Sequence, residues 1–214
     1  MTVKGITVEV NSASDSVDAA AKPAVLDYST LTGGGLEVVT GGDPVKLDFD
    51  ADLLRVSVSD ATFALGEFIY VRGGFALELR GAIEVTDLAG ATKEVSLVTF
   101  GISNAYVFAG VGGPYWTDSN NDGVVNGDDT PVSAGAMGVA LGNVNAAIAF
   151  FKPTDTNDTV SYTALKVVAD SAAFVGLEGL LTLTAKDITI SANIASDSAN
   201  PDFDPTSLNL SALT

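Results

Sequence analysis

The chain contains neither cysteine nor histidine among its 214 residues. Without cysteine it can form no disulfide, no thiolate nucleophile and no cysteine zinc site. Without histidine it can build neither a Ser-His-Asp triad nor an imidazole metal cluster. Hydrolytic chemistry would have to rest on paired carboxylates, and no such pair stands out from the other acidic residues. We therefore expect a protein that is not an enzyme.

Basic residues are also scarce, because 10 Lys and Arg face 27 Asp and Glu, which gives a net charge of −17. Such a surface repels nucleic acids and anionic membranes, which bind proteins through Lys and Arg. No apolar run reaches the ~18 residues that a membrane-spanning helix needs. The first ten residues, MTVKGITVEV, alternate in polarity and do not read as a signal peptide. We expect no nucleic-acid partner and no membrane insertion.

The end of the chain restates its beginning. Thr2–Thr32 aligns without a gap on Thr184–Thr214, at an offset of 182 residues, and 14 of the 31 positions are identical. Ordinary residue frequencies would give roughly two or three matches by chance. The match continues past the alternating pattern into the irregular stretch ASDS. This predicts that residues 1–214 are one unit of a tandem array with a period of about 182 residues. The alternative is a single domain with two similar edge strands.

Alternation of apolar with small or polar residues dominates the rest of the sequence and predicts β-strands. The predicted strands are Leu54–Leu65, Gly74–Val85, Val95–Gly110, Met137–Phe150, Thr163–Gly176 and Leu180–Ile194. A polar residue interrupts several of them, at Asp60, Asn104, Asn143, Asp170 and Asp187. If these interruptions mark bends, the unit is an elongated β-solenoid or a coiled antiparallel sheet. If they do not, a β-sandwich accounts for the same strands. The fold class is all-β in each case.

One motif carries chemistry, the segment DSNNDGVVNGDD at Asp118–Asp129. It fits the twelve-residue calcium-loop pattern, in which alternate oxygen ligands converge on one cation and a glycine at position 6 permits the sharp turn. The predicted ligands are Asp118, Asn120, Asp122, the carbonyl of Val124, Asn126 and Asp129. Asn at position 9 and Asp at position 12 resemble the dockerin variant of this loop.

The resemblance to an EF-hand or dockerin covers only about a dozen residues. Glycine and proline fill both flanks where an EF-hand has helices, and a dockerin has two such loops. We therefore expect an isolated calcium loop inserted at residues 114–131 between strands, without cohesin binding. The alternative is an Asn/Asp/Gly-rich turn that binds no metal. Trp116 adjoins the loop, so a calcium-dependent glycan site is a further possibility, although such a ring more often anchors a loop to the core.

Longer phrases resemble the tandem repeats of giant secreted, adhesin-like proteins of bacteria. These phrases are GEFIYVRGGFALE at Gly66–Glu78, ISNAYVFAGVGG at Ile102–Gly113, the stretch Tyr162–Asn193 and VLDYST at Val25–Thr30. The resemblance implies an extracellular or cell-surface location, neighbouring repeat units as partners and a structural or adhesive role. The sequence thus predicts a calcium-stabilised all-β repeat module, and the alternative is a calcium-dependent glycan-binding module that contacts surface glycans.

Overall fold

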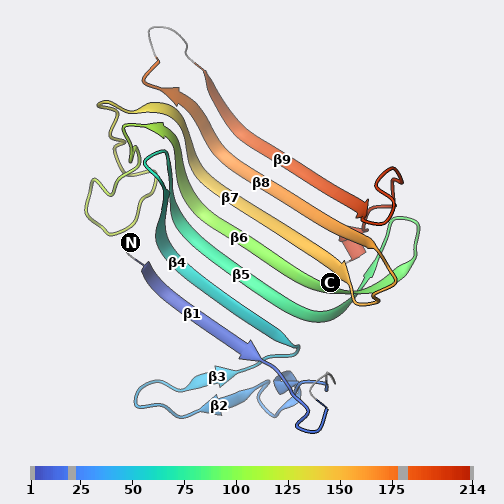
Figure 1. Ribbon diagram of the computed structural model, residues 1–214. Coiled ribbons are helices and arrows are strands. Elements are labelled where there is room, and N and C mark those ends of the chain that lie inside the picture. The colour runs from blue at the N-terminus through green and yellow to red at the C-terminus, as the bar shows by residue number, and fades with distance from the viewer. Residues whose placement is uncertain (1–2, 19–22, 178–182, 213–214) are drawn as a thin grey trace.

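The computed structural model describes residues 3–18, 23–177 and 183–212, and strands dominate it (Figure 1). Seven strands form one large antiparallel sheet: β1 (Val3–Asn11), β4 (Leu53–Leu65), β5 (Ile69–Thr86), β6 (Thr92–Val111), β7 (Met137–Pro153), β8 (Val160–Val175) and β9 (Thr184–Asp197). A second sheet has only β2 (Leu36–Val38) and β3 (Val45–Leu47). The helices within the described ranges are single 3-10 turns, η1 (Tyr28–Thr30) and η2 (Leu210–Ala212). None of them is long and apolar enough to cross a membrane.

The large sheet is a meander in which each strand from β4 to β9 pairs with the next along the chain. The β2–β3 hairpin stands apart, so β1 pairs directly with β4. This order leaves β1 and β9 at opposite edges of the sheet (Figure 1). The all-β prediction is confirmed, and the coiled antiparallel sheet is the form adopted. Strands β4 to β9 cover the six predicted strands, except for Gly176 and Leu183, which lie just outside β8 and β9. Residues 180–182 of the last predicted strand lie outside the described residues.

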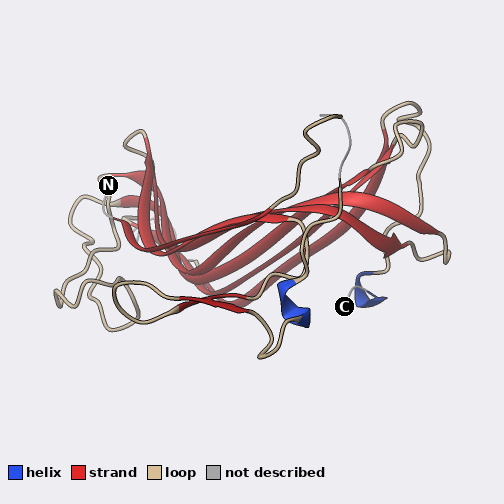
Figure 2. Cartoon of the chain, turned by 90° about the horizontal axis from the view of Figure 1, so that it is seen from below, coloured by secondary structure: helices blue, strands red, loops and turns tan. Residues whose placement is uncertain are grey.

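All the long strands bend at a similar level, so the sheet forms one curved layer (Figure 2). Asn104, Asn143 and Asp187 have positive φ at this level, between 48° and 52°, as does Gly5 in β1 at 59°. The strand pairing also shifts register here, between Val58 and Ala61 of β4 and in the neighbouring ladders. Bulges of this kind bend a strand and increase its twist. The bends predicted at Asn104, Asn143 and Asp187 are therefore confirmed. Of the other two predicted positions, Asp60 lies within the register shift of β4, and Asp170 shows neither a positive φ nor a register shift.

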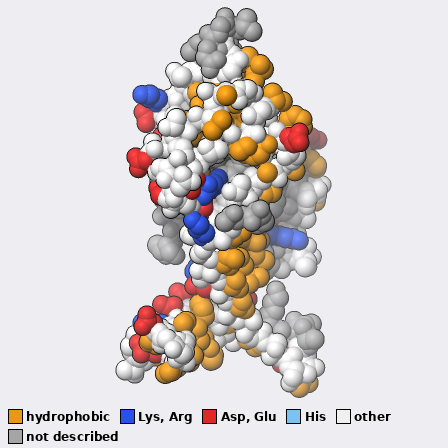
Figure 3. Space-filling view, turned by 90° about the vertical axis from the view of Figure 1, so that its left-hand side faces the viewer, with side chains coloured by type: hydrophobic (Ala, Val, Ile, Leu, Met, Phe, Trp, Pro, Cys, Tyr) orange, Lys and Arg blue, Asp and Glu red, His pale blue; other side chains and the backbone are white. Residues whose placement is uncertain are grey.

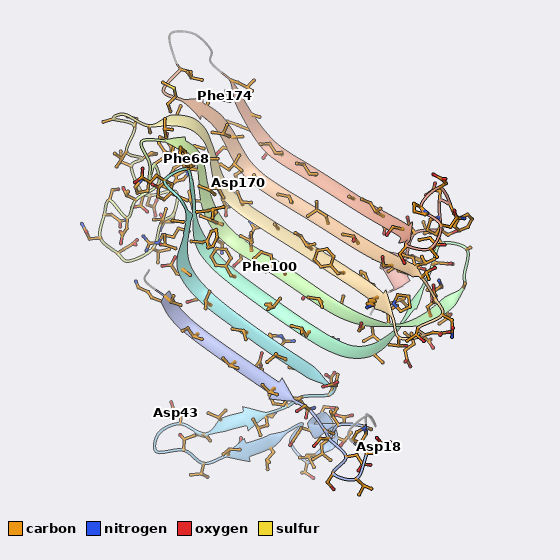
Figure 4. All side chains as sticks on the ribbon, in the orientation of Figure 1. Asp18, Asp43, Phe68, Phe100, Asp170 and Phe174 are labelled. Atoms are coloured by element: carbon orange, nitrogen blue, oxygen red, sulfur yellow. The ribbon has the colours of Figure 1, made fainter. Side chains whose placement is uncertain are left out.

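Beyond the bend, one face of the sheet is apolar in every strand. Its members are Ile6, Val8, Val10, Leu54, Val56, Val58, Phe75, Leu77, Leu79, Val98, Phe100, Ile102, Ala146, Ile148, Phe150, Leu165, Val167, Ile190, Ala192 and Ile194. Phe100 lies on the broad part of this surface, while Asp170 lies near the bend (Figure 4). Ile6 is 63% exposed, and hydrophobic side chains form a band along the molecule in Figure 3. This apolar face is uncovered within the described residues.

The opposite face carries the best-packed core. Val85, Val95, Phe151 and Tyr162 bury Leu208, which belongs to the segment after β9. That segment reaches the β5–β6 hairpin, where Leu208 forms an antiparallel bridge with Asp87. A second cluster, around Phe108, lies at the other end of the sheet beside the β6–β7 connection. The chain therefore anchors two of its irregular segments, the β6–β7 loop and the tail after β9, on buried side chains.

Candidate metal centre and repeated edge strands

The predicted calcium loop lies in the irregular connection between β6 and β7. Trp116 fixes its start, because its Nε1 donates to the carbonyl of Val107 at 3.1 Å and its ring packs edge-on against Tyr106 and Tyr115. Val125, in the middle of the loop, is only 4% exposed. The segment is thus an ordered loop held to the sheet by aromatic packing and one buried apolar side chain.

Short hydrogen bonds shape the loop from within. Asn120 Oδ1 accepts from the backbone N–H of Asp122, and Asp122 Oδ1 accepts from that of Val124. Asp118 Oδ2 accepts from the N–H of Gly123 at 2.9 Å, which closes the first half of the loop. Gly123 has a φ of +91°, a conformation that residues with a Cβ rarely adopt. The glycine at position 6 therefore serves the sharp turn that the motif predicts.

Asp129 closes the second half of the loop from a buried position. Its Oδ1 accepts from the N–H groups of Ser119 and Asn120, and its Oδ2 accepts from the N–H of Asn126. The N–H of Asn126, followed by those of Ser119 and Asn120, lowers the pKa of this carboxyl below its usual range. Sequence reasoning assigned Asp129 to a cation, and in this structure its oxygens also organise the backbone of the loop.

Some of the remaining oxygen atoms of the loop suit a hard cation. Asp118 Oδ1 is buried and has no hydrogen-bond partner, so one carboxylate oxygen in the loop is unsatisfied. A bound cation would satisfy it, since a buried carboxylate oxygen without a partner costs free energy. Asn120 and Asp122 lie beside each other, with Nδ2 of the amide 3.1 Å from Oδ2 of the carboxylate. Across the described ranges, however, no three acidic side chains converge as a metal site.

Two basic side chains of the sheet hold the loop at the carbonyl of Gly123, which is not one of the ligand positions of the calcium motif. Lys4 Nζ and Arg72 Nη2 both donate to the carbonyl of Gly123, at 2.7 and 2.9 Å. Arg72 also pairs with the buried carboxylate of Asp60 at 3.1 Å. Sequence reasoning missed these contacts because Lys4 lies 119 residues and Arg72 lies 51 residues from Gly123. The loop thus bridges the first edge strand, β1, to the interior strand β5.

The two similar sequence segments also share their local structure. Asn11 Nδ2 donates to the carbonyl of Leu26, and Asn193 Nδ2 donates to that of Leu208. The bend residue of β1, Gly5, corresponds at the same offset to the bend residue of β9, Asp187.

The likeness continues after the strands. Asp15 accepts from the two N–H groups that follow it by two and three residues, and Asp197 does the same. These bonds lower the pKa of Asp15, and for Asp197 the Thr159 hydroxyl contributes most to the lowered pKa. The 3-10 turns η1 and η2 also begin 182 residues apart. Residues 2, 19–22, 213 and 214 of the aligned segments lie outside the described residues.

Equivalent residues differ in what covers them. Leu26 is 69% exposed, whereas Leu208 is 1% exposed beneath the β5–β6 hairpin. Conversely, Asn11 is 7% exposed and bonds a second carbonyl, that of Ala51, while Asn193 is exposed. The two segments therefore have different neighbours. The first segment lies beside β4, and the second lies beside β8 and the β5–β6 hairpin.

Comparisons of the chain with protein-family models, with curated proteins and with solved structures found no match.

Proposed function

We propose that the chain is a structural repeat module of a large extracellular bacterial protein, and that calcium in the Asp118–Asp129 loop stabilises it. The observation that carries the proposal is the shared local structure of two segments 182 residues apart, down to the same side-chain hydrogen bonds. A module of this kind extends and spaces a surface protein. The resemblance of its phrases to adhesin-like repeats supports the same role.

The loop supports the calcium part of the proposal through its oxygen donors. Asp118 would supply the unsatisfied Oδ1, with further oxygens from Asn120, Asp122, Val124, Asn126 and Asp129. Calcium prefers six to eight oxygen ligands and tolerates mixed carboxylates, amides and carbonyls. The cation would hold the two halves of the loop together, and an ion that binds only the native state raises stability by mass action. Such a lock would act after export into calcium-rich surroundings.

A calcium-dependent glycan-binding module is less well supported. Stacking on a sugar needs an accessible aromatic face, but Trp116 is half-buried and packs edge-on against Tyr106 and Tyr115. Its indole N–H is also used by a backbone carbonyl. These contacts favour the role of a loop anchor. A glycan-array signal that Trp116→Ala abolishes would favour glycan binding instead.

The test is thermal unfolding with calcium and with EDTA, monitored by circular dichroism. We expect calcium to raise the melting temperature of the chain and Asp122→Ala to remove that rise. Asp128→Ala is the matched control, because Asp128 is exposed in the same loop and stands at position 11, outside the ligand positions. If calcium leaves the melting temperature unchanged, the loop is an ordinary turn and calcium has no part in the function.

A further inference from the structure

We infer that the outer edge of β9 binds the strand equivalent to β4 in a following copy of the same unit, so that consecutive copies share one continuous sheet. This inference rests on the tandem arrangement proposed above and specifies how its members join. In it, β9 serves both as the last strand of one copy and as the first strand of the next.

The orientation of the two edge strands is the first argument. Six antiparallel steps separate β1 from β9, so the two strands run in the same direction. One row of direct partners crosses the whole sheet: Asn11, Leu53, Arg80, Leu97, Phe151, Tyr162 and Ala195. Direct partners project from the same face. Asn193, two residues from Ala195, therefore faces the same side as its equivalent Asn11.

Strand direction and face together decide which edge is available. Because β1 and β9 match in both respects, the edge that β1 presents to β4 corresponds to the outer edge of β9. The inner edge of β9 is paired with β8 along its length. The outer edge has no partner strand within the described part of the chain. A long edge with unpaired backbone groups is a template for another strand.

The contacts that each segment lacks identify the occupant. Asn193 has the carbonyl of Leu208, and its equivalent Asn11 has in addition the carbonyl of Ala51, just before β4. A following copy would bring its own Ala51 to Asn193. Leu26 in turn would gain the β5–β6 hairpin of a preceding copy, as Leu208 has here. Each segment thus lacks the contact that a neighbouring copy would provide.

The Asp118–Asp129 loop would take part in the same junction. Lys4 of β1 donates to the carbonyl of Gly123, and its equivalent in β9 is Lys186, which is identical and exposed. The loop of the following copy would therefore close over Lys186 as the present loop closes over Lys4. The register follows from the β1–β4 ladder, in which Thr7 pairs with Ser57. Thr189 would pair with Ser57 of the following copy.

Disulfide trapping tests this register. Because the chain contains no cysteine, the two introduced residues are the only ones that can form a disulfide. The protein is a longer chain in which residues 33–214 are appended after Thr214, with Thr189→Cys in the first copy and Ser57→Cys in the appended copy. Direct partners have Cβ atoms ~4.5–5.5 Å apart, close enough for a disulfide after a small adjustment. We expect mild oxidation to close this pair as completely as Thr7→Cys with Ser57→Cys in the 214-residue chain. Thr189→Cys with Thr62→Cys of the appended copy is out of register and should stay reduced.

The inference is overturned if the Thr7 and Ser57 control closes while the pair across the junction does not. Hydrogen exchange on the two cysteine-free chains gives an independent reading. We expect alternate amides of β9, those that point away from β8, to exchange at least tenfold more slowly in the longer chain, and unchanged exchange would also overturn the inference. A calcium-dependent melting temperature without the cross-link would leave the module and remove the shared sheet. A cross-link without any calcium effect would leave the shared sheet and remove only the calcium part of the proposed function.

Discussion

Leu208 and Leu26 offer a matched pair for measuring what the junction contact contributes. Both are leucines, and both offer their carbonyl to an asparagine 15 residues earlier. Leu208 is 1% exposed against Val85 and Phe151, whereas Leu26 is 69% exposed. Truncation of a fully buried leucine typically costs ~2–5 kcal/mol, so we expect Leu208→Ala to lower the free energy of unfolding by about 3 kcal/mol. Leu26→Ala should change it by less than ~0.5 kcal/mol.

Guanidinium unfolding followed by circular dichroism measures both variants against the parent chain. For a domain of this size, ~3 kcal/mol corresponds to a fall of roughly 6–12 °C in melting temperature. The slope of the free energy with denaturant should not change, because neither substitution alters the surface exposed on unfolding. Equal losses for the two variants would refute the reasoning, since they would mean that the hairpin contact does not distinguish the two leucines.

Two further predictions concern acid and the bend. The pKa of Asp129 lies below its ordinary value of 3.8, so its contribution to stability is present above that pH and is lost as the pH falls through the folded-state pKa. Asp129→Asn should therefore flatten the fall in melting temperature below about pH 4, and an unchanged acid profile would contradict this. At the bend, Asn104 has a φ of 48°, so Asn104→Val should cost ~1–2 kcal/mol more than Asn104→Gly. Equal stability of these two variants, measured by denaturant unfolding, would argue against the left-handed conformation.

The strands could be predicted because alternation is a local signal. Every predicted strand from Leu54 onward has a counterpart, and the polar interruptions at Asn104, Asn143 and Asp187 are bends. The β2–β3 hairpin could not be predicted, since strands of three residues carry too little alternation. Nor does the pattern distinguish a meander from a sandwich, because pairing depends on which faces meet after folding.

The candidate site was predictable only in its spacing. The motif places Asp118, Asn120 and Asp122 on one loop, and the structure brings the last two side chains together. The role of Asp129 depends on N–H groups up to ten residues away, and the clamp on Gly123 depends on Lys4 and Arg72 from two strands. Such contacts are set by tertiary structure and leave no mark in the local sequence.

The meander decides how a chain of joined copies would respond to a pull. Each copy would add six strands side by side, or about 28 Å of length at the usual strand spacing. The pull would act along the hydrogen bonds between strands, because these bonds run perpendicular to antiparallel strands. Strands would then peel away one after another rather than break together. A stretch of 182 residues extends to roughly 600–650 Å. Each unfolded copy would therefore be about twenty times longer than the folded copy, so the array would lengthen under force before the chain breaks.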